Sequence, residues 1–154
     1  MFNNNPKFSK SVVISTNFGK NCKIIQPVNI YDAEIGSDVF IGPFVEIQKN
    51  ASIGDNTKVQ SHSFICELVE IGNNCFIGHG VMFINDLFLD GGPAYGDTSK
   101  WRKTSIGNNV SIGSNSTILP VEICDNTVIG AGSVVTKDIL ESGKYAGNPA
   151  RNIN

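Results

Sequence analysis

The sequence is poor in the residues that build helices. Its 154 residues include only 5 Leu and 6 Ala, the side chains that lose least on entering a helix. It has no apolar run near the roughly 18 residues that a membrane-spanning helix requires, and its first ten residues lack the apolar centre of a signal peptide. These absences exclude a helical bundle and argue against an ordinary α/β protein, and we expect no membrane association.

Charge and cysteine usage exclude further classes. A net charge of −2 gives no overall basic field for nucleic acid or for an anionic membrane. The 4 cysteines, Cys22, Cys66, Cys75 and Cys124, show no Cys-x-x-Cys spacing, which argues against a zinc site or a redox pair. We therefore expect reduced thiols, no bound metal, no nucleic-acid partner and a cytoplasmic protein.

The abundant residues point to strands and turns. The chain has 19 Ile and 13 Val together with 16 Gly and 18 Asn. Ile and Val are stiff at χ1 and favour strands, whereas Gly and Asn accept positive φ at turns. The length suits a single domain with its own core, or one domain of a longer chain.

Large apolar residues recur at every sixth position over the middle of the chain. Gly often follows directly, as at Gly36, and Asp or Asn often stands three places on, as at Asp38 and Asn50. The nine consecutive apolar positions are Ile35, Ile41, Ile47, Ile53, Val59, Ile65, Ile71, Ile77 and Phe83. A period of six fits no helix, and alternation holds only inside each hexad, so each unit is predicted to be a short strand and a tight turn. Such units bury their apolar side only by stacking, which predicts a solenoid with an Ile and Val interior.

The repeat extends on both sides of this run. An earlier register joins it by a one-residue deletion, and after Phe83 the pattern stops and restarts at Ile106. The outer positions are Val12, Phe18, Ile24, Ile30, Ile106, Ile112, Ile118, Ile123, Ile129 and Val135, with one residue missing between Ile118 and Ile123.

In these hexads, over residues 12–136, the chain resembles the hexapeptide-repeat acyltransferases. The resemblance implies an all-β fold, a left-handed parallel β-helix with three hexads in each triangular coil. Nineteen hexads would make about six coils, or roughly 29 Å of solenoid at a strand spacing of ~4.8 Å. We expect one domain, residues 1–154, with a loop insertion at 84–105 and a C-terminal tail at 137–154.

The interruption at residues 84–105 is the expected place of the chemistry, because loops on rigid scaffolds commonly carry function. It holds the only tryptophan, Trp101, and a cluster of cations that could meet phosphate groups: Lys100, Arg102 and Lys103. No Lys or Arg stands between Val59 and Ser99. The carboxylates of this stretch are then uncompensated and would suit an amine-bearing ligand: Glu67, Glu70, Asp86, Asp90 and Asp97. The alternative is a solvated loop whose charges are simply exposed.

A narrower resemblance is carried by four segments: CFIGHGVMFINDLF, VNIYDAEIGSDVFIGPFVEIQ, VQSHSFICE and GAGSVVTKDI…GNPAR. They are similar to the sugar-nucleotide N-acetyltransferases that acetylate the 3-amino group of dTDP- or UDP-linked amino-deoxy sugars for surface polysaccharides. The resemblance implies acetyl-CoA as cosubstrate, a nucleotide-linked amino sugar as acceptor, and a homotrimer with its active sites between subunits. It places the pair Asn85 and Asp86 at the sugar.

The chemistry requires few residues, because attack of an amine on a thioester depends chiefly on alignment. With an amine pKa near ~8, a base is helpful rather than essential. We expect Asp86 to accept a hydrogen bond from the amine, Asn85 to hold the sugar or the amine, and His79 to act as the base. His79 and His62 could equally be polar corner residues bonded to the backbone. Cys66 and Cys75 occupy small-residue positions and are expected to be structural.

Two further sets of contacts follow from the loop and from the resemblance. The substrate set is His62, Glu67, Phe83, Trp101 and Arg102. The cofactor set is Gly130, Ala131, Gly132, Ser133, Lys137, Pro149 and Arg151, in which the glycines would let the backbone approach the pantetheine arm and the cations would meet phosphate.

Three other functions were considered for this fold. A γ-type carbonic anhydrase needs three histidines around zinc, and the chain has only 2, so this reading is set aside. O-acetylation of a sugar would need a true base, so loss of His79 should then abolish turnover. A non-catalytic assembly module or an ice-binding solenoid leaves the long interruption without a purpose.

Overall fold

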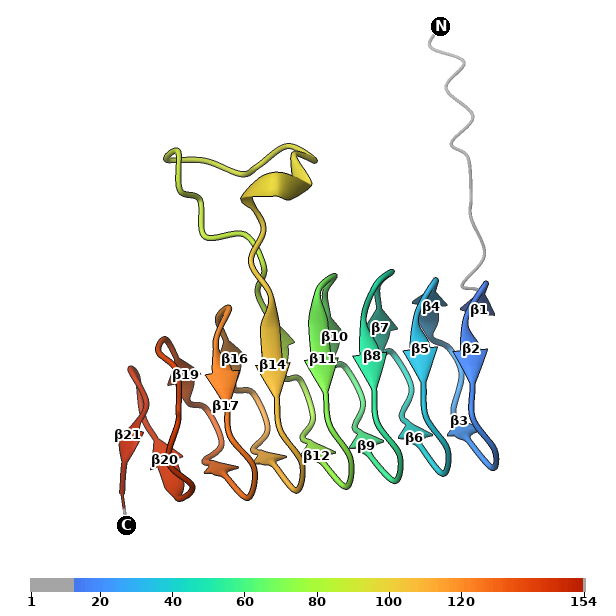
Figure 1. Ribbon diagram of the computed structural model, residues 1–154. Coiled ribbons are helices and arrows are strands. Elements are labelled where there is room, and N and C mark those ends of the chain that lie inside the picture. Colours follow the sequence, from blue (N-terminus) through green and yellow to red (C-terminus); the bar gives the residue numbers. More distant parts are fainter. Residues whose placement is uncertain (1–12, 154) are drawn as a thin grey trace, which may run out of the picture.

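The computed structural model describes residues 13–153, so Val12, the first position of the earliest register, lies outside the described residues. It contains 21 strands and one short 3-10 helix, η1 (Thr98–Lys100). Strands β1 to β19 follow one another around three sheets, and each strand from β1 to β16 pairs in parallel with the strand three places on (Figure 1). The all-β fold is a left-handed parallel β-helix, as predicted.

Each of the three sheets takes one strand from every coil. Sheet I is formed by seven strands: β1 (Val13–Ile14), β4 (Asn29–Tyr31), β7 (Glu46–Ile47), β10 (Phe64–Ile65), β13 (Met82–Phe83), β16 (Thr117–Ile118) and β19 (Val134–Val135). Sheet II is formed by six: β2 (Asn17–Phe18), β5 (Glu34–Ile35), β8 (Ser52–Ile53), β11 (Val69–Ile71), β14 (Thr104–Ile106) and β17 (Glu122–Ile123). Sheet III is formed by eight: β3 (Lys23–Ile24), β6 (Phe40–Ile41), β9 (Lys58–Val59), β12 (Phe76–Ile77), β15 (Ser111–Ile112), β18 (Val128–Ile129), β20 (Lys144–Ala146) and β21 (Arg151–Asn152).

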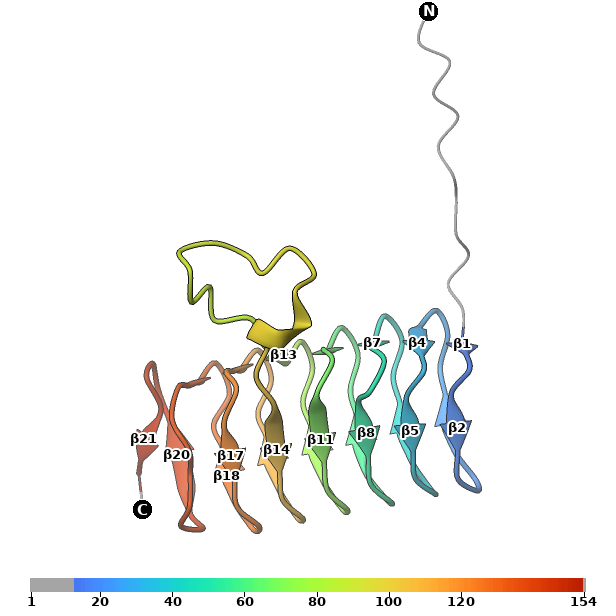
Figure 2. The ribbon, with the colours of Figure 1, turned by 45° about the horizontal axis from the view of Figure 1, so that its top comes forward.

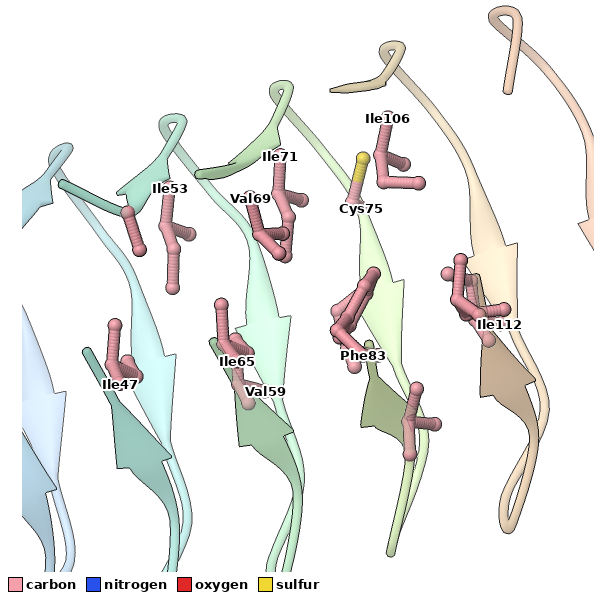
Figure 3. Close-up of a cluster of buried hydrophobic side chains, with 14 of the residues drawn as sticks. Ile47, Ile53, Val59, Ile65, Val69, Ile71, Cys75, Phe83, Ile106 and Ile112 are labelled. Atoms are coloured by element: carbon pink, nitrogen blue, oxygen red, sulfur yellow. The ribbon is translucent and has the colours of Figure 1, made fainter. Parts of the chain in front are cut away.

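The core is the predicted interior column. The hexad residue ends nearly every strand from β2 to β19 and points inward, while the residue before it points outward, because successive side chains of a strand alternate. Ile47, Ile65 and Phe83 are each fully buried and lie inside the coils (Figure 3). Burying one such side chain stabilises the fold by about 1.5–3 kcal/mol. The stack of hexads therefore holds the rod rigid along its whole length.

The turns also follow the sequence. Asp38, Asn50 and Asn56 have the expected left-handed backbone, with φ of 57–58°. Glycine follows the hexad residue for a different reason, because the next coil approaches too closely to leave room for a side chain. A Cβ at Gly54 would lie 2.7 Å from the carbonyl carbon of Gly72 and 2.8 Å from the amide nitrogen of Asn73.

Three edges join the sheets, and we name them by what they carry. The loop edge joins sheet I to sheet II, and the histidine edge joins sheet III to sheet I. The asparagine edge joins sheet II to sheet III and is braced by side chains that accept backbone N–H groups of the neighbouring coil. On it the Asp55 N–H donates to Asn73 Oδ1 at 2.7 Å, and the Asn108 N–H donates to Asp125 Oδ1 at 2.7 Å.

The segment expected to be a tail continues the solenoid. Ile139 bridges Ile123 of sheet II, β20 pairs with β18 in sheet III, and the Ala150 N–H donates to the Val134 carbonyl at 2.8 Å. Eighteen of the 19 hexads match strands β2 to β19, and β1 begins one residue after Val12. Residues 137–153 add most of a seventh coil without hexad spacing, so the prediction of about six coils was short. No helix within residues 13–153 is long and apolar enough to cross a bilayer.

Candidate active site

A loop leaves the solenoid at the loop edge, between the end of β13 and the start of β14. It comprises residues 84–103 and stands away from the coils in both ribbon views (Figures 1 and 2). The expected interruption ran to residue 105, but Thr104 and Ser105 already pair with Val69 and Glu70 of β11. The loop is therefore a true insertion between two strands of the regular rod.

Asp86 organises this loop. Its Oδ1 accepts the Phe88 N–H at 2.9 Å and its Oδ2 accepts the Ala94 N–H at 2.7 Å. Because both carboxylate oxygens accept backbone N–H groups, the main role of Asp86 in this structure is to hold the loop in its conformation. The expected contact with a substrate amine would need a second lone pair on one of these oxygens.

Asn85 lies at the base of the loop and has a fixed side chain. Its Nδ2 donates to the Glu67 carbonyl oxygen at 3.2 Å, and its own backbone carbonyl accepts the Arg102 N–H at 2.9 Å. The Glu67 N–H in turn donates to Gln48 Oε1 at 3.3 Å, and Gln48 Nε2 donates to Glu46 Oε1 at 3.0 Å. This chain of bonds across three coils commits one face of the Asn85 amide and leaves Oδ1 as an acceptor.

Four of the five carboxylates around the loop have a cation partner, so the expectation that they are uncompensated was wrong for these four. Glu67 pairs with Lys49 at 3.5 Å, Glu70 with Lys103 at 2.7 Å, and Asp90 with Lys100 at 2.6 Å. Asp97 also lies 3.7 Å from Lys100, and hydrogen bonds from Ser99 lower the pKa of its carboxyl group. Cations distant in sequence reach these groups through the coil and the folded loop, so the charge pattern is no argument for an amine-bearing ligand. The same pairing occupies two of the three cations expected to meet phosphate.

The expected substrate contacts separate into exposed and buried groups. Trp101 is half-buried and ends η1, with its N–H donating to the Thr98 carbonyl at 3.1 Å. Arg102 is exposed on the returning strand of the loop, whereas Glu67 is buried below it. Phe83 is 0% exposed in the interior column, because the hexad position that it occupies points inward. It therefore cannot contact a substrate, and its expected role is corrected.

His79 lies on the histidine edge and is exposed. Its Nδ1 lies 2.9 Å from Ser61 Oγ, one coil away, and its backbone is held on both sides by the next coil. If Nδ1–H donates to the serine, Nε2 carries the lone pair that a base requires. The arrangement thus combines the two expected possibilities, since a corner residue anchored to its neighbours presents one free face of its ring.

His62 occupies the same edge one coil earlier and stacks on Phe44. The ring centroids are 4.9 Å apart with an interplanar angle of 29°. Both residues have a left-handed backbone, with φ of 60° for Phe44 and 64° for His62. The hexad pattern did not single out Phe44, although a phenylalanine at the position where other hexads have Asn or Asp was a usable signal.

The expected cofactor contacts divide between two edges. Ala131 and Gly132 are exposed on the histidine edge, two coils beyond His79, and a Cβ on Gly132 would meet nothing within 4 Å. Ser133 is buried, donates to the Gly130 carbonyl at 2.6 Å and accepts the Gly147 N–H at 3.2 Å, so it braces the corner. Pro149 and Arg151 flank the turn after β20 and are exposed near the same end. Lys137 follows β19 and therefore lies on the loop edge, apart from the others.

The thiols have a structural setting. Burial raises the pKa of Cys66 to about 12 and also raises the pKa of Cys75. A thiol that stays protonated at neutral pH is a poor nucleophile. Among residues 13–153 no group of three or more His, Cys, Asp or Glu side chains could hold a metal ion.

The candidate groups therefore lie on two edges of one chain. His79 precedes β13 and Asn85 follows it, so the width of sheet I separates them, roughly 15–20 Å for six residues of extended chain. That distance excludes a direct contact between the two side chains within one protomer. The histidine edge carries a possible base and an open backbone, and the loop edge carries a fixed amide and an ordered loop.

Comparison with known proteins assigns the fold to a family. The model "Bacterial transferase hexapeptide (six repeats)" matches residues 32–67, and "Hexapeptide repeat of succinyl-transferase" matches residues 103–137, one on each side of the loop. The bifunctional protein GlmU of Clostridium kluyveri is 36% identical over 156 residues, which is 97% of this chain. On both sides of the loop the chain is thus similar to the hexapeptide-repeat acyltransferases. It spans only 30% of the length of that GlmU protein.

Solved hexapeptide-repeat structures resemble the chain over most of its length. A mutant of AntD, an N-acyltransferase from Bacillus cereus, was crystallised with dTDP and coenzyme A; it is 25% identical, with a TM-score of 0.78 over 92% of this chain and 83% of that one. Another AntD mutant, 24% identical with a TM-score of 0.67 over 91% and 83%, holds dTDP-4-amino-4,6-dideoxyglucose and coenzyme A. The polysialic acid O-acetyltransferase OatWY is 26% identical, with a TM-score of 0.67 over 90% of this chain and 72% of its own.

Proposed function

We propose that this protein is an acetyl-CoA-dependent N-acetyltransferase that acetylates the amino group of a nucleotide-linked amino-deoxy sugar. The expected acceptor is a dTDP-3-amino-3,6-dideoxyhexose, and the expected assembly of the protein is a homotrimer. Each active site would lie between the histidine edge of one protomer and the loop edge of its neighbour.

The observation that carries this proposal is the division of the candidate groups between two edges. His79 with the exposed corner at Ala131 and Gly132 forms one half of a site, and Asn85 with its loop forms the other. The first half lacks the amide that would orient the amine, and the second half lacks the histidine and the open corner. A second copy of the chain set against the first would supply the missing half, and closed homo-oligomers are the common way to do so.

The chemistry follows from these groups. The amine nitrogen attacks the thioester carbonyl carbon, a tetrahedral oxyanion forms, the C–S bond breaks, and coenzyme A leaves as thiolate. Asn85 Oδ1, left free by the Glu67 bond, would accept an N–H of the amine and aim its lone pair at the carbonyl. His79 Nε2 would take the proton that the nitrogen loses and pass it to the thiolate. A backbone N–H of a neighbouring coil would stabilise the oxyanion.

A thiol-release assay tests the proposal. The protein is incubated with acetyl-CoA and, in parallel, with dTDP-3-amino-3,6-dideoxy-glucose, dTDP-3-amino-3,6-dideoxy-galactose, dTDP-4-amino-4,6-dideoxyglucose and neutral sugars. We expect coenzyme A release with a 3-amino sugar nucleotide, and mass spectrometry should find one added acetyl group on the sugar. Coenzyme A release with the 4-amino sugar alone would place the acceptor amine at C4 instead of C3. Release with neutral sugars alone would contradict N-acetylation.

O-acetylation is the second candidate, favoured by the similarity to OatWY and by the His79–Ser61 pair, since a hydroxyl acceptor requires a base. The residual activity of His79→Ala separates the two. With an amine of pKa near ~8, that activity should rise between pH 7 and 9 as more amine becomes neutral. With a hydroxyl acceptor no such rise is expected.

A further inference from the structure

Phe44 breaks the rule of the corners. At the same hexad position most other turns have Asn, Asp or Gly, which accept a left-handed backbone. Phe44 has φ of 60° there and remains 57% exposed. A bulky residue in this conformation costs about 1–3 kcal/mol, and an exposed ring recovers little of that by burial. Such strain at a surface position is typical of a site that binds something.

The neighbouring coil departs from the rule in the same place. His62 also has a left-handed backbone, and its ring stacks on that of Phe44. The histidine supports one face of the phenyl ring and limits its rotation. Together the two rings form a small aromatic platform on the histidine edge.

A hollow of about 260 Å³ adjoins this platform. It is lined by Pro27, Val28, Asn29, Phe44, Val45 and Glu46. Sites for whole small molecules usually measure roughly 300–1,000 Å³, so this hollow suits one ring of a longer ligand.

The polar groups of the hollow define the ring it would accept. Glu46 Oε1 already accepts Gln48 Nε2 at 3.0 Å, which fixes the carboxylate and leaves the capacity of Oε2 for an outside donor. Asn29 adds an amide that can donate to a carbonyl. An acceptor next to a donor matches the imide edge of uracil or thymine, which presents an N–H beside a carbonyl oxygen.

The position along the edge fits one end of a sugar nucleotide. Phe44 lies two coils before His79 and Gly132 lies two coils after it, each roughly 10 Å away at ~4.8 Å per coil. An acceptor amine at His79 would thus have the open cofactor corner on one side and the platform on the other. A diphosphate linker spans the space between a reacting sugar and its base.

We propose that Phe44, supported by His62, and the hollow beside it bind the pyrimidine base of the sugar nucleotide. This rests on the proposed function, since it assigns the base end of that substrate. Stacking of a base on an aromatic side chain is largely tolerant of base identity, so the platform supplies affinity and Glu46 with Asn29 supplies the preference for uracil or thymine.

Calorimetric titration of the intact protein with dTDP, UDP and ADP tests this proposal. The variant is Phe44→Asn, because Asn occupies the same left-handed position at seven other corners of the described chain and should fold there. The matched control is Phe76→Ala, which removes an exposed phenyl ring from sheet III. We expect the Kd for dTDP and UDP to rise at least about 10-fold in Phe44→Asn, to stay unchanged in Phe76→Ala, and the Kd for coenzyme A to stay unchanged in both.

An unchanged Kd for dTDP in Phe44→Asn would overturn the proposal. So would a changed oligomeric state by light scattering with unchanged dTDP affinity, because the platform would then be a subunit contact. ADP binding as tightly as dTDP would overturn the pyrimidine preference. Failure of the proposed function is a separate result, because it would show as binding of dTDP without acetyl transfer to any amino-sugar nucleotide.

Discussion

The contact between Ser61 and His79 bears on the proposed role of the histidine as a base. A base at Nε2 requires that Nδ1–H donate to Ser61 Oγ across the 2.9 Å contact. His79→Ala should therefore lower kcat about 100-fold for the acetyl acceptor. Ser61→Ala should lower it less, with little change in KM, because the ring remains and only its tautomer and orientation are lost.

Steady-state kinetics of the two variants check this. Asn115→Ala, an exposed corner residue one coil beyond His79, is the control and should keep the wild-type kcat. Equal kcat values for His79→Ala and wild type would remove the histidine from the mechanism.

The thiols give a second test at the residue scale. The raised pKa of Cys66, about 12, keeps the thiol protonated far above neutral pH. Because only the thiolate reacts rapidly, we expect iodoacetamide at pH 8 to leave Cys66 unmodified in the native protein and to modify it after denaturation. Cys75 should behave in the same way. Peptide mass spectrometry measures both, and native labelling of Cys66 would show that its coil opens.

Individual residues were only partly predictable from the sequence. The interior identity of Ile47 or Ile65 follows from spacing alone, because an inward position can hold little else. The ion-pair partner of Glu70 could not be predicted, because Lys103 lies next to Glu70 only once the loop between them has folded. Phe83 was misassigned because its proximity in sequence to Asn85 concealed that the hexad position points inward.

At the scale of the strand and its turn, the next coil sets the tolerance for side chains. A Cβ at Gly54 would lie 2.7 Å from the backbone of Gly72, so the coils must separate locally. Gly54→Ala should therefore lose about 1–3 kcal/mol of unfolding free energy. The control is Gly92→Ala in the loop, where a Cβ meets nothing within 4 Å, and its stability should change by less than about 0.5 kcal/mol. Urea unfolding measures the unfolding free energy of both variants. Equal losses would mean that contact with the next coil is not the reason for glycine at position 54.

The loop should depend on Asp86 in a way that the solenoid does not. Asp86→Ala leaves the Phe88 and Ala94 N–H groups without their acceptors, so the loop should become more mobile. We expect faster tryptic cleavage at Lys100, Arg102 or Lys103 with a Tm close to wild type. Asp90→Ala removes only an exposed ion pair, worth about 0–1 kcal/mol, and should cleave much more slowly. Equal cleavage rates in the two variants would contradict the role given to Asp86.

Elements of the fold were more predictable than the loop. Six-residue spacing located the 18 strands β2 to β19, because in each coil the same position must point inward to bury an apolar side chain. The segment 137–153 joins the solenoid through Ile139 and β20 without that spacing, and no repeat could reveal it. The loop has no period, so its course depends on Asp86 and on ion pairs formed only in the folded chain.

For the whole molecule, the separation of the two edges is the decisive feature. Residues six apart in sequence, His79 and Asn85, stand on opposite sides of sheet I. The resemblance implied active sites between subunits, and the separation of the two side chains within one protomer supports the proposal that a site containing both is shared by two protomers. An active site within one chain and an active site between chains therefore make opposite predictions for mixed oligomers.

The most direct measurement mixes two variants of low activity. His79→Ala and Asn85→Ala are each purified, then denatured together at equal amounts, refolded and assayed for acetyl transfer. In a trimer with shared sites, random assembly leaves about one quarter of the sites with both side chains intact, so the mixture should recover about one quarter of wild-type activity. Each variant refolded alone should stay near its low starting level. Recovery of no activity in the mixture, with trimers present by light scattering, would contradict a site built from two edges.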